Sequence, residues 1–106
     1  MDKIRVLKDL IDTFGISGFE GPIRKKIKEL FPQAEFKEDE VGNLSTTIGS
    51  GGRQIAFMAH MDELGFLISY VEKNGYLRFK PIGGWDVRGV YNRVVEILTD
   101  QGMVQG

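Results

Sequence analysis

Residues 53–85 decide the fold, and at their centre lies the segment IAFMAHMDE, residues 55–63. Residues 55–59 are a short apolar run bounded by turn residues, a pattern that predicts a buried strand. His60, the only histidine in the chain, follows this run directly, and Asp62 and Glu63 come just after it. Strand ends often carry functional side chains because the sheet holds the backbone rigidly. We therefore expect the functional site at this corner.

The composition indicates an ordinary globular protein and excludes several function classes. The 106 residues correspond to one domain or to part of a larger protein. Hydrophobic residues make up 42% and charged residues 27% of the chain, and the net charge of −1 favours neither nucleic acid nor an anionic membrane as a partner. We expect neither a membrane span nor a signal peptide. Cysteine is absent, which excludes disulfides and thiolate metal sites and fits a cytoplasmic protein.

The first 31 residues predict two helices. Apolar residues spaced three and four apart place one apolar face on the first helix: Ile4, Leu7, Leu10, Ile11 and Phe14. Gly15 then fits the left-handed position that commonly ends a helix. The second helix begins either at a capping box formed by Ser17 and Glu20 or slightly later at Pro22, and Pro32 ends it. Its basic run, residues 24–28, is interpreted as a solvated face rather than a phosphate site, because glutamates flank it.

The next segment predicts strands at residues 34–38 and 44–48, joined by a turn. The glycine-rich residues 49–52 are then expected to connect a hairpin. A phosphate-binding loop would need a helix directly after it, and here a strand is predicted instead.

Two further hairpins are predicted after the histidine. Residues 64–71 and 76–81 are expected to pair through Asn74-Gly75, a strong signal for a tight turn. Residues 94–99 form another strand, and a partner strand begins at Met103. Such a short partner leaves an open sheet edge, which we expect another chain or further sequence to cover.

The spacing of His60, Asp62 and Glu63 leaves two interpretations open. In an extended segment residues two apart share a side, so His60 and Asp62 point together and Glu63 points away. A metal-ligating histidine is usually oriented by a carboxylate, but a catalytic zinc ion needs about three protein ligands. The pair is therefore either one part of a metal site or a hydrogen-bonded cap at a strand end.

Other chemistries receive less support from the sequence. A serine triad is disfavoured because no serine lies in a nucleophile-elbow context; the candidates are Ser17, Ser45, Ser50 and Ser69. Trp85 follows two glycines and is expected to be a core aromatic rather than a platform for stacking a sugar or a base.

Several separated motifs, in the same order, resemble those of a known family and cover nearly all of the chain. They are SGFE (17–20), DEVGNL (39–44), AHMDELGF (59–66), NGYLRF (74–79) and IGGW (82–85). The chain resembles the N-terminal part of the tetrahedral aminopeptidases, also called glutamyl or deblocking aminopeptidases. These are co-catalytic metallopeptidases that are often mislabelled as cellulases or endoglucanases.

The resemblance implies an α/β fold, mixed α+β in this portion. Residues 1–65 would be the N-terminal part of the catalytic domain, with two helices and strands of a mixed sheet. Residues 66–106 would open an incomplete, β-rich, PDZ-like dimerisation domain. His60 would be a ligand of one of two zinc or cobalt ions, and Asp62 would have a catalytic role by orienting that histidine. The other ligands and the general-base glutamate lie further downstream in family members.

The implied function is that of a metal-dependent aminopeptidase that removes N-terminal residues from peptides in the cytoplasm. The complete protein would be a homo-oligomer built on dimers, with a dodecamer as one form, and this chain alone would be inactive. The alternative is a truncated, non-catalytic assembly or binding module that pairs through its open sheet edge. Carbohydrate hydrolysis is disfavoured, because the adjacent Asp62 and Glu63 are expected to point to opposite sides rather than flank a sugar cleft.

Overall fold

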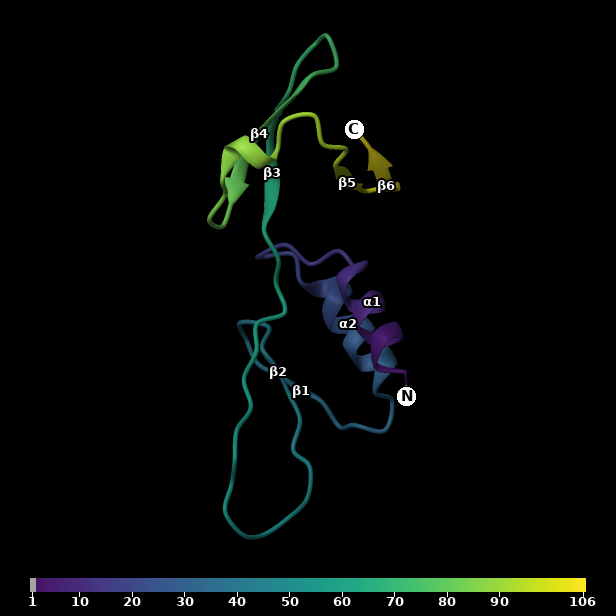
Figure 1. Cartoon of the computed structure of the whole chain (residues 1–106), viewed down its shortest axis with the longest axis vertical. Helices are drawn as coiled ribbons and strands as arrows, with labels where there is room; N and C mark the ends of the chain where they lie inside the picture. The colour runs from purple at the N-terminus through teal and green to yellow at the C-terminus, as the bar shows by residue number, and fades with distance from the viewer. Residues whose placement is uncertain (1) are drawn as a thin grey trace.

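The computed structural model describes residues 2–106 as an elongated chain (Figure 1). Its extents are 61 × 27 × 25 Å, and its Cα radius of gyration is 17.3 Å. A compact domain of about 100 residues has a radius of gyration of about 13 Å. Two packed helices occupy the middle, the C-terminal β-hairpins lie at one end, and a short strand pair and a long loop lie toward the other (Figure 1). Because the chain is elongated, its described elements do not pack around one common hydrophobic core.

The two predicted helices are present and lie side by side (Figure 1). Helix α1, Lys3–Ile11, begins after Asp2, whose side chain accepts a hydrogen bond from the Ile4 amide at 3.0 Å. Such a cap satisfies one of the amides that a helix start leaves free. Helix α2, Gly21–Leu30, begins with Pro22 in its first turn and ends before Pro32. Within residues 2–106, neither helix is long and apolar enough to cross a bilayer.

Two sequence expectations near these helices were wrong. Ser17 and Glu20 form no capping box: Glu20 is the N-cap of α2 without a capping hydrogen bond from its side chain. Glu20 instead accepts from the Gly18 amide at 2.7 Å, which holds the pKa of its carboxyl below the usual range. Gly15 is not in the left-handed region, and α1 ends four residues before it. Ser17, the expected cap, and Gly15, the expected helix end, instead form hydrogen bonds with residues distant in the sequence.

The basic run on α2 is a solvated face, as expected. Arg24 lies 3.0 Å from a carboxylate oxygen of Glu38, and Lys28 lies 2.9 Å from the other. The Lys28 ammonium holds the pKa of the Glu38 carboxyl below its usual range. Lys25 and Lys26 both approach Glu29, at 3.9 and 3.7 Å. With each cation next to a carboxylate, the run has little excess charge for binding phosphate.

The expected mixed sheet is not formed within residues 2–106, where the strands make three separate two-stranded antiparallel sheets. Strand β1, Lys37–Glu38, pairs with β2, Leu44–Ser45, and both are much shorter than predicted. A turn between them is held by Asp39, whose carboxylate accepts from the amides of Val41 and Asn43 and from the Asn43 side chain. These bonds, led by the one from the Asn43 side chain, lower the pKa of Asp39.

The predicted buried strand at residues 55–59 was also wrong. Residues 46–62 contain no strand, so the glycine-rich residues 49–52 do not connect a hairpin. Ile55, Phe57 and Met58 are 75%, 95% and 93% exposed. A strand forms only where a neighbour accepts its backbone hydrogen bonds, and the described chain offers this segment none. We call residues 46–61 the open loop; it is the long extension at the end opposite the hairpins (Figure 1).

The two predicted C-terminal hairpins are confirmed. Strand β3, Gly65–Val71, pairs with β4, Leu77–Ile82, through a turn in which Gly75 has φ 89°. Strand β5, Glu96–Thr99, pairs with β6, Gly102–Gln105, over four residues. A 3-10 turn, Val87–Gly89, lies between the hairpins. The division at residue 65 falls at the start of β3, and the two-domain organisation stays a prediction.

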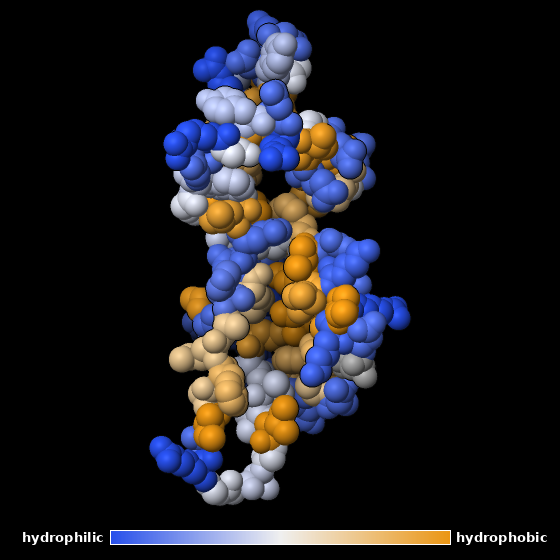
Figure 2. All heavy atoms as spheres, in the orientation of Figure 1, coloured by the Kyte–Doolittle hydropathy of each residue, from blue (hydrophilic) through white to orange (hydrophobic). Residues whose placement is uncertain are grey.

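Burial is concentrated at one place. Among the described hydrophobic side chains only Ile16, 8% exposed, and Ile23, 4% exposed, are buried. Apolar side chains are otherwise spread over the visible surface, with a concentration along the helices and the neighbouring extended segment (Figure 2). Large exposed apolar area usually marks an interaction surface.

Candidate functional site

The candidate site begins where the loop before α2 meets the segment before β3. The Glu63 amide donates to the Gly15 carbonyl at 2.9 Å, and the Glu63 side chain accepts from the Gly15 amide at 3.2 Å. Ile16 and Glu63 form an isolated parallel bridge. We call residues 15–17 together with residues 62–65 the clamp. It joins segments almost 50 residues apart, as the 48-residue separation of Gly15 and Glu63 shows.

Glycine at two positions lets the clamp close. A Cβ on Gly15 would lie 2.9 Å from Ile23 Cγ2, and a Cβ on Gly65 would overlap the Ile16 side chain. Neither glycine has a positive φ, so the requirement is for space rather than for backbone conformation. The two buried isoleucines therefore pack against backbone that carries no side chain.

His60 and Asp62 point together, as the sequence predicted. His60 Nδ1 lies 3.1 Å from Asp62 Oδ1 and 2.9 Å from the Asp62 carbonyl oxygen. A carboxylate and a carbonyl only accept hydrogen bonds, so in the neutral imidazole these contacts assign the proton to Nδ1 and leave the lone pair on Nε2. The His60 side chain is 86% exposed. This geometry leaves the other ring nitrogen, Nε2, accessible from solvent.

Asp62 has a second partner that the sequence did not indicate. The Ser17 hydroxyl donates to Asp62 Oδ2 at 2.5 Å, so the two carboxylate oxygens serve two different groups. The bond from Ser17 is the main cause that lowers the pKa of Asp62, and His60 lowers it further, while partial burial opposes both. The Asp62 carboxylate is therefore anionic at neutral pH and held from both sides.

This arrangement is not a serine triad. In a triad the serine hydroxyl bonds to the imidazole, which removes its proton, and the aspartate holds the other ring nitrogen. Here the Ser17 hydroxyl bonds to Asp62, and His60 Nε2 faces solvent. Ser17 is thus a support for the carboxylate and not a nucleophile activated by His60.

The residues present fit only part of a metal site. Across residues 2–106 no group of three or more His, Cys, Asp or Glu side chains is placed to hold a metal ion. A catalytic zinc site uses about three protein ligands. The described chain therefore offers one imidazole ligand with its orienting carboxylate, and further ligands would have to come from elsewhere.

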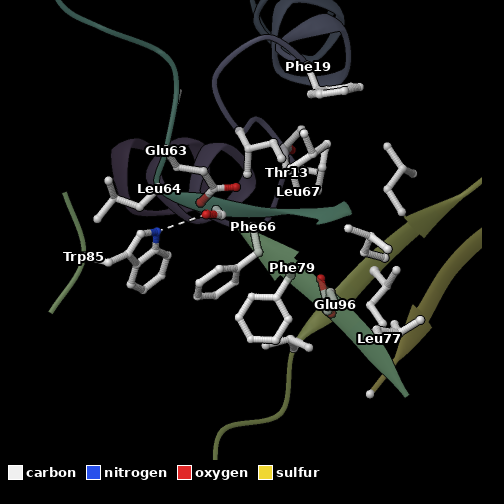
Figure 3. A pocket seen from close by; sticks show the side chains of 18 of the residues that line it. Thr13, Phe19, Glu63, Leu64, Phe66, Leu67, Leu77, Phe79, Trp85 and Glu96 are labelled. Atoms are coloured by element: carbon white, nitrogen blue, oxygen red, sulfur yellow. Dashed lines mark hydrogen bonds between the residues drawn. The ribbon is translucent and has the colours of Figure 1, made fainter. Parts of the chain in front are cut away.

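An apolar cavity of about 910 Å³ lies beside the clamp, between the end of α1, the hairpins and Trp85 (Figure 3). The Trp85 indole N–H lies 3.0 Å from the carbonyl oxygens of both Gly65 and Ile82. Its ring stacks on Phe66 with centroids 4.5 Å apart, and Phe66 also contacts Phe79. Trp85 is half-buried, so its predicted place in the core is only partly met; its indole ties the start of β3 to the end of β4.

Comparison with known proteins shows the family. The family model described as M42 glutamyl aminopeptidase matches residues 42–106, more than half of the chain. The chain belongs to the M42 glutamyl aminopeptidase family. This membership confirms the resemblance drawn from the sequence motifs.

Individual M42 relatives match nearly the whole chain. The glutamyl aminopeptidase of Lactococcus lactis subsp. cremoris is 36% identical over 95% of this chain and 29% of its own length. The lysyl aminopeptidase of Pyrococcus furiosus is 29% identical over 92% of this chain and 29% of its own length. The TET1 peptidase structure from Pyrococcus horikoshii, which can assemble into a tetrahedron or a large octahedral shell, superposes with a TM-score of 0.90 at 42% identity. It covers 99% of this chain, which spans 32% of that structure.

Two elements of the candidate site differ from the sequence-based prediction. Ser17 was assigned to a helix cap, and Gly15 to a helix end, because both assignments use neighbours in the sequence. Their actual partners, Asp62 and Glu63, lie 45 and 48 residues away. The only available signal was that SGFE and AHMDELGF occur together in the set of motifs.

Proposed function

We propose that this chain supplies the N-terminal part of a metal-dependent M42 aminopeptidase that removes N-terminal residues from peptides in the cytoplasm. His60 would be the metal ligand, and Asp62 would orient it. The single observation that carries this proposal is the His60–Asp62 pair, in which Nδ1 faces Asp62 and the imidazole is open to solvent. An orienting carboxylate of this kind accompanies most metal-ligating histidines.

The complete site would hold two divalent metal ions, zinc or cobalt. Such ions polarise the scissile carbonyl and activate water. This chain would contribute the His60 ligand and its support, and the other ligands and the general base would come from the part of the relatives that lies outside the match. The chain by itself would then be inactive. The two named relatives carry different N-terminal residues in their names, so the proposal is limited to the reaction class.

The proposal includes the domain organisation and assembly. Residues 1–65 would belong to the catalytic domain, and residues 66–106 would begin a PDZ-like dimerisation domain of a homo-oligomer. The assemblies named for the TET1 peptidase and the exposed apolar residues of the open loop support this view. In the complete protein residues 55–59 would enter a larger sheet.

A non-catalytic assembly module is the second candidate. The observation in its favour is the extended and exposed apolar run of the open loop, where Phe57 is 95% exposed. Such a segment can add to the sheet edge of a partner, which is a known mode of recognition.

The test is release of N-terminal amino acids from short peptides by the natural full-length polypeptide, with and without a metal chelator. We expect turnover that the chelator abolishes, and a loss of at least 100-fold in His60→Ala. Gln54→Ala, in the same open loop, serves as the matched control and should keep full activity. Unchanged turnover in His60→Ala would overturn the assignment of His60. A polypeptide without metal-dependent turnover that forms a chelator-resistant oligomer would favour the assembly module.

A further inference from the structure

The Ser17 hydroxyl forms a tertiary hydrogen bond, and it acts neither as a helix cap nor as a nucleophile. Its bond to Asp62 Oδ2, at 2.5 Å, crosses 45 residues of sequence. Serine side chains more often bond to nearby backbone, as the Ser69 hydroxyl does when it donates to the Arg78 carbonyl at 3.2 Å. Ser17 therefore has a specific target in the candidate site.

The Asp62 carboxylate is held at two points. Oδ2 accepts from Ser17, and Oδ1 faces His60 Nδ1 at 3.1 Å. One hydrogen bond leaves a carboxylate free to rotate about its terminal bond, which has a broad torsional minimum. Two bonds on opposite oxygens fix the plane of the carboxylate and thereby the direction in which it holds the imidazole.

Ser17 is itself firmly placed. The neighbouring Ile16 is buried against Gly65, and Gly15 exchanges hydrogen bonds with Glu63. The backbone on both sides of the Ser17–Asp62 bond thus belongs to the clamp. His60, by contrast, lies at the end of the open loop with an exposed side chain. The clamp therefore positions the His60 imidazole through Asp62, which bonds to both Ser17 and His60.

We infer that Ser17 is a positioning residue of the metal site, which fixes the Asp62 carboxylate so that His60 presents Nε2 to a divalent cation. This inference rests on the proposed function. Ser17 touches neither the metal nor the substrate; it acts through Asp62. Loss of an outer partner of a metal ligand typically costs 10- to 100-fold in metal affinity or activity. For Ser17, one contact further out, we expect about a tenfold loss of zinc affinity.

The test measures zinc affinity of the natural full-length polypeptide by competition with a chromophoric chelator. Ser17→Ala should lose about tenfold in affinity. Ser17→Thr and Ser17→Val form an isosteric pair that differs in one hydroxyl, so Thr should keep affinity within about twofold of wild type and Val should match Ala. Ser69→Ala removes a serine hydroxyl from the β3–β4 hairpin and should change nothing.

A double-mutant cycle separates positioning from a general effect on the fold. If Ser17 acts through Asp62, Ser17→Ala should cause no further loss of zinc affinity in an Asp62→Ala background. Additive losses would mean that Ser17 acts independently of Asp62, and would overturn the inference. Catalysis at saturating zinc gives a second readout: kcat of Ser17→Ala should fall while KM for the peptide stays within about twofold.

The outcomes distinguish this inference from the proposed function. If His60→Ala binds zinc as well as wild type, the proposed function fails and the inference fails with it. If His60→Ala loses zinc while Ser17→Ala and Ser17→Val retain it, only the inference is overturned. If Ser17→Ala is unfolded, the Thr and Val pair decides. If Val and Ala are both unfolded by circular dichroism, Ser17 is structural and the inference is wrong.

Discussion

The clamp and the open loop adjoin one another in sequence, but they differ in hydrogen bonding and in side-chain burial. The clamp contains few residues, but these contact one another closely. Gly15 and Glu63 exchange hydrogen bonds, and the Ile16 side chain is only 8% exposed. The open loop is richer in large apolar side chains, yet Phe57 and Met58 are 95% and 93% exposed. Hydrophobicity alone therefore does not bury a segment of this chain; a segment packs where the described residues provide a partner for its backbone.

The candidate site lies at the boundary between these regions. Asp62 belongs to the clamp and bonds to Ser17, whereas His60 lies near the end of the open loop, and Asp62 is the only described residue to which its ring bonds. A functional side chain gains precision when a neighbour on a packed element fixes it. Three substitutions and one exchange measurement test this difference between the two regions, in order of decreasing effect.

Truncating the buried isoleucine that packs against the clamp should have the largest effect on stability. Ile23→Ala removes a side chain that is 4% exposed and packs against Gly15, and we expect a loss of about 2–4 kcal/mol in the free energy of unfolding. Ile48→Ala, in the open loop at 93% exposure, should change it by less than about 0.5 kcal/mol. Denaturant titration measures both. Equal losses would show that the open loop is as well packed as the clamp.

Adding a methyl group inside the clamp should have the next largest effect. Gly65→Ala places a Cβ where the Ile16 side chain lies, and we expect a loss of about 1–3 kcal/mol through overpacking. Gly84→Ala is the control, because a Cβ there meets nothing within 4 Å and its φ is not positive. Thermal unfolding of the two variants compares them directly. A Gly65→Ala protein as stable as Gly84→Ala would contradict the packing of the clamp.

Hydrogen exchange should separate the regions without mutation. The Glu63 amide donates to the Gly15 carbonyl at 2.9 Å and should be protected, while the amides of residues 54–59 should exchange at nearly the rate of an unfolded chain. Mass spectrometry or NMR of the 106-residue chain measures this. In a complete, assembled protein the same residues should become protected if they enter a sheet. Strong protection in the isolated chain would refute the open loop as described.

Removing the Ser17 hydroxyl should have the smallest effect, visible in a single pKa. Ser17 is the main cause of the lowered pKa of Asp62, so Ser17→Ala should raise that pKa toward the ordinary aspartate value. A lowered pKa in the folded state adds stability that is present above the ordinary pKa and is lost as pH falls through the folded value. The variant should therefore show a shallower loss of stability on acidification.

NMR titration of the Asp62 carboxyl carbon measures this shift. Asp39 provides an internal control, since its lowered pKa depends on Asn43 and should not respond. A change at both residues would point to a general loosening of the chain rather than to the Ser17 bond.

The parts of the fold that the sequence predicted are those with local causes. Helix α1 follows from its apolar spacing, and the β3–β4 hairpin follows from Asn74-Gly75, where Gly75 takes φ 89°. The pairing of His60 with Asp62 also needed only the alternation of an extended backbone. Each of these depends on residues within one element.

The parts that the sequence did not predict have distant causes. The apolar run at residues 55–59 has a strand-like composition, but a strand also needs a neighbour that the described chain does not provide. Ser17 and Gly15 looked like a cap and a helix stop because the rules for these positions consider adjacent residues only. Contacts across 45 and 48 residues lie beyond such rules.

The fluorescence of Trp85, the single tryptophan, can report on the clamp. The Trp85 indole N–H lies 3.0 Å from the Gly65 carbonyl oxygen at the edge of the clamp, and its ring stacks on Phe66. Its fluorescence therefore depends on Gly65, which belongs to the clamp, and on Phe66 next to it. Opening of the clamp should release the indole to water and shift its emission to longer wavelength. Unfolding experiments on the isolated chain can thus be followed without an added dye.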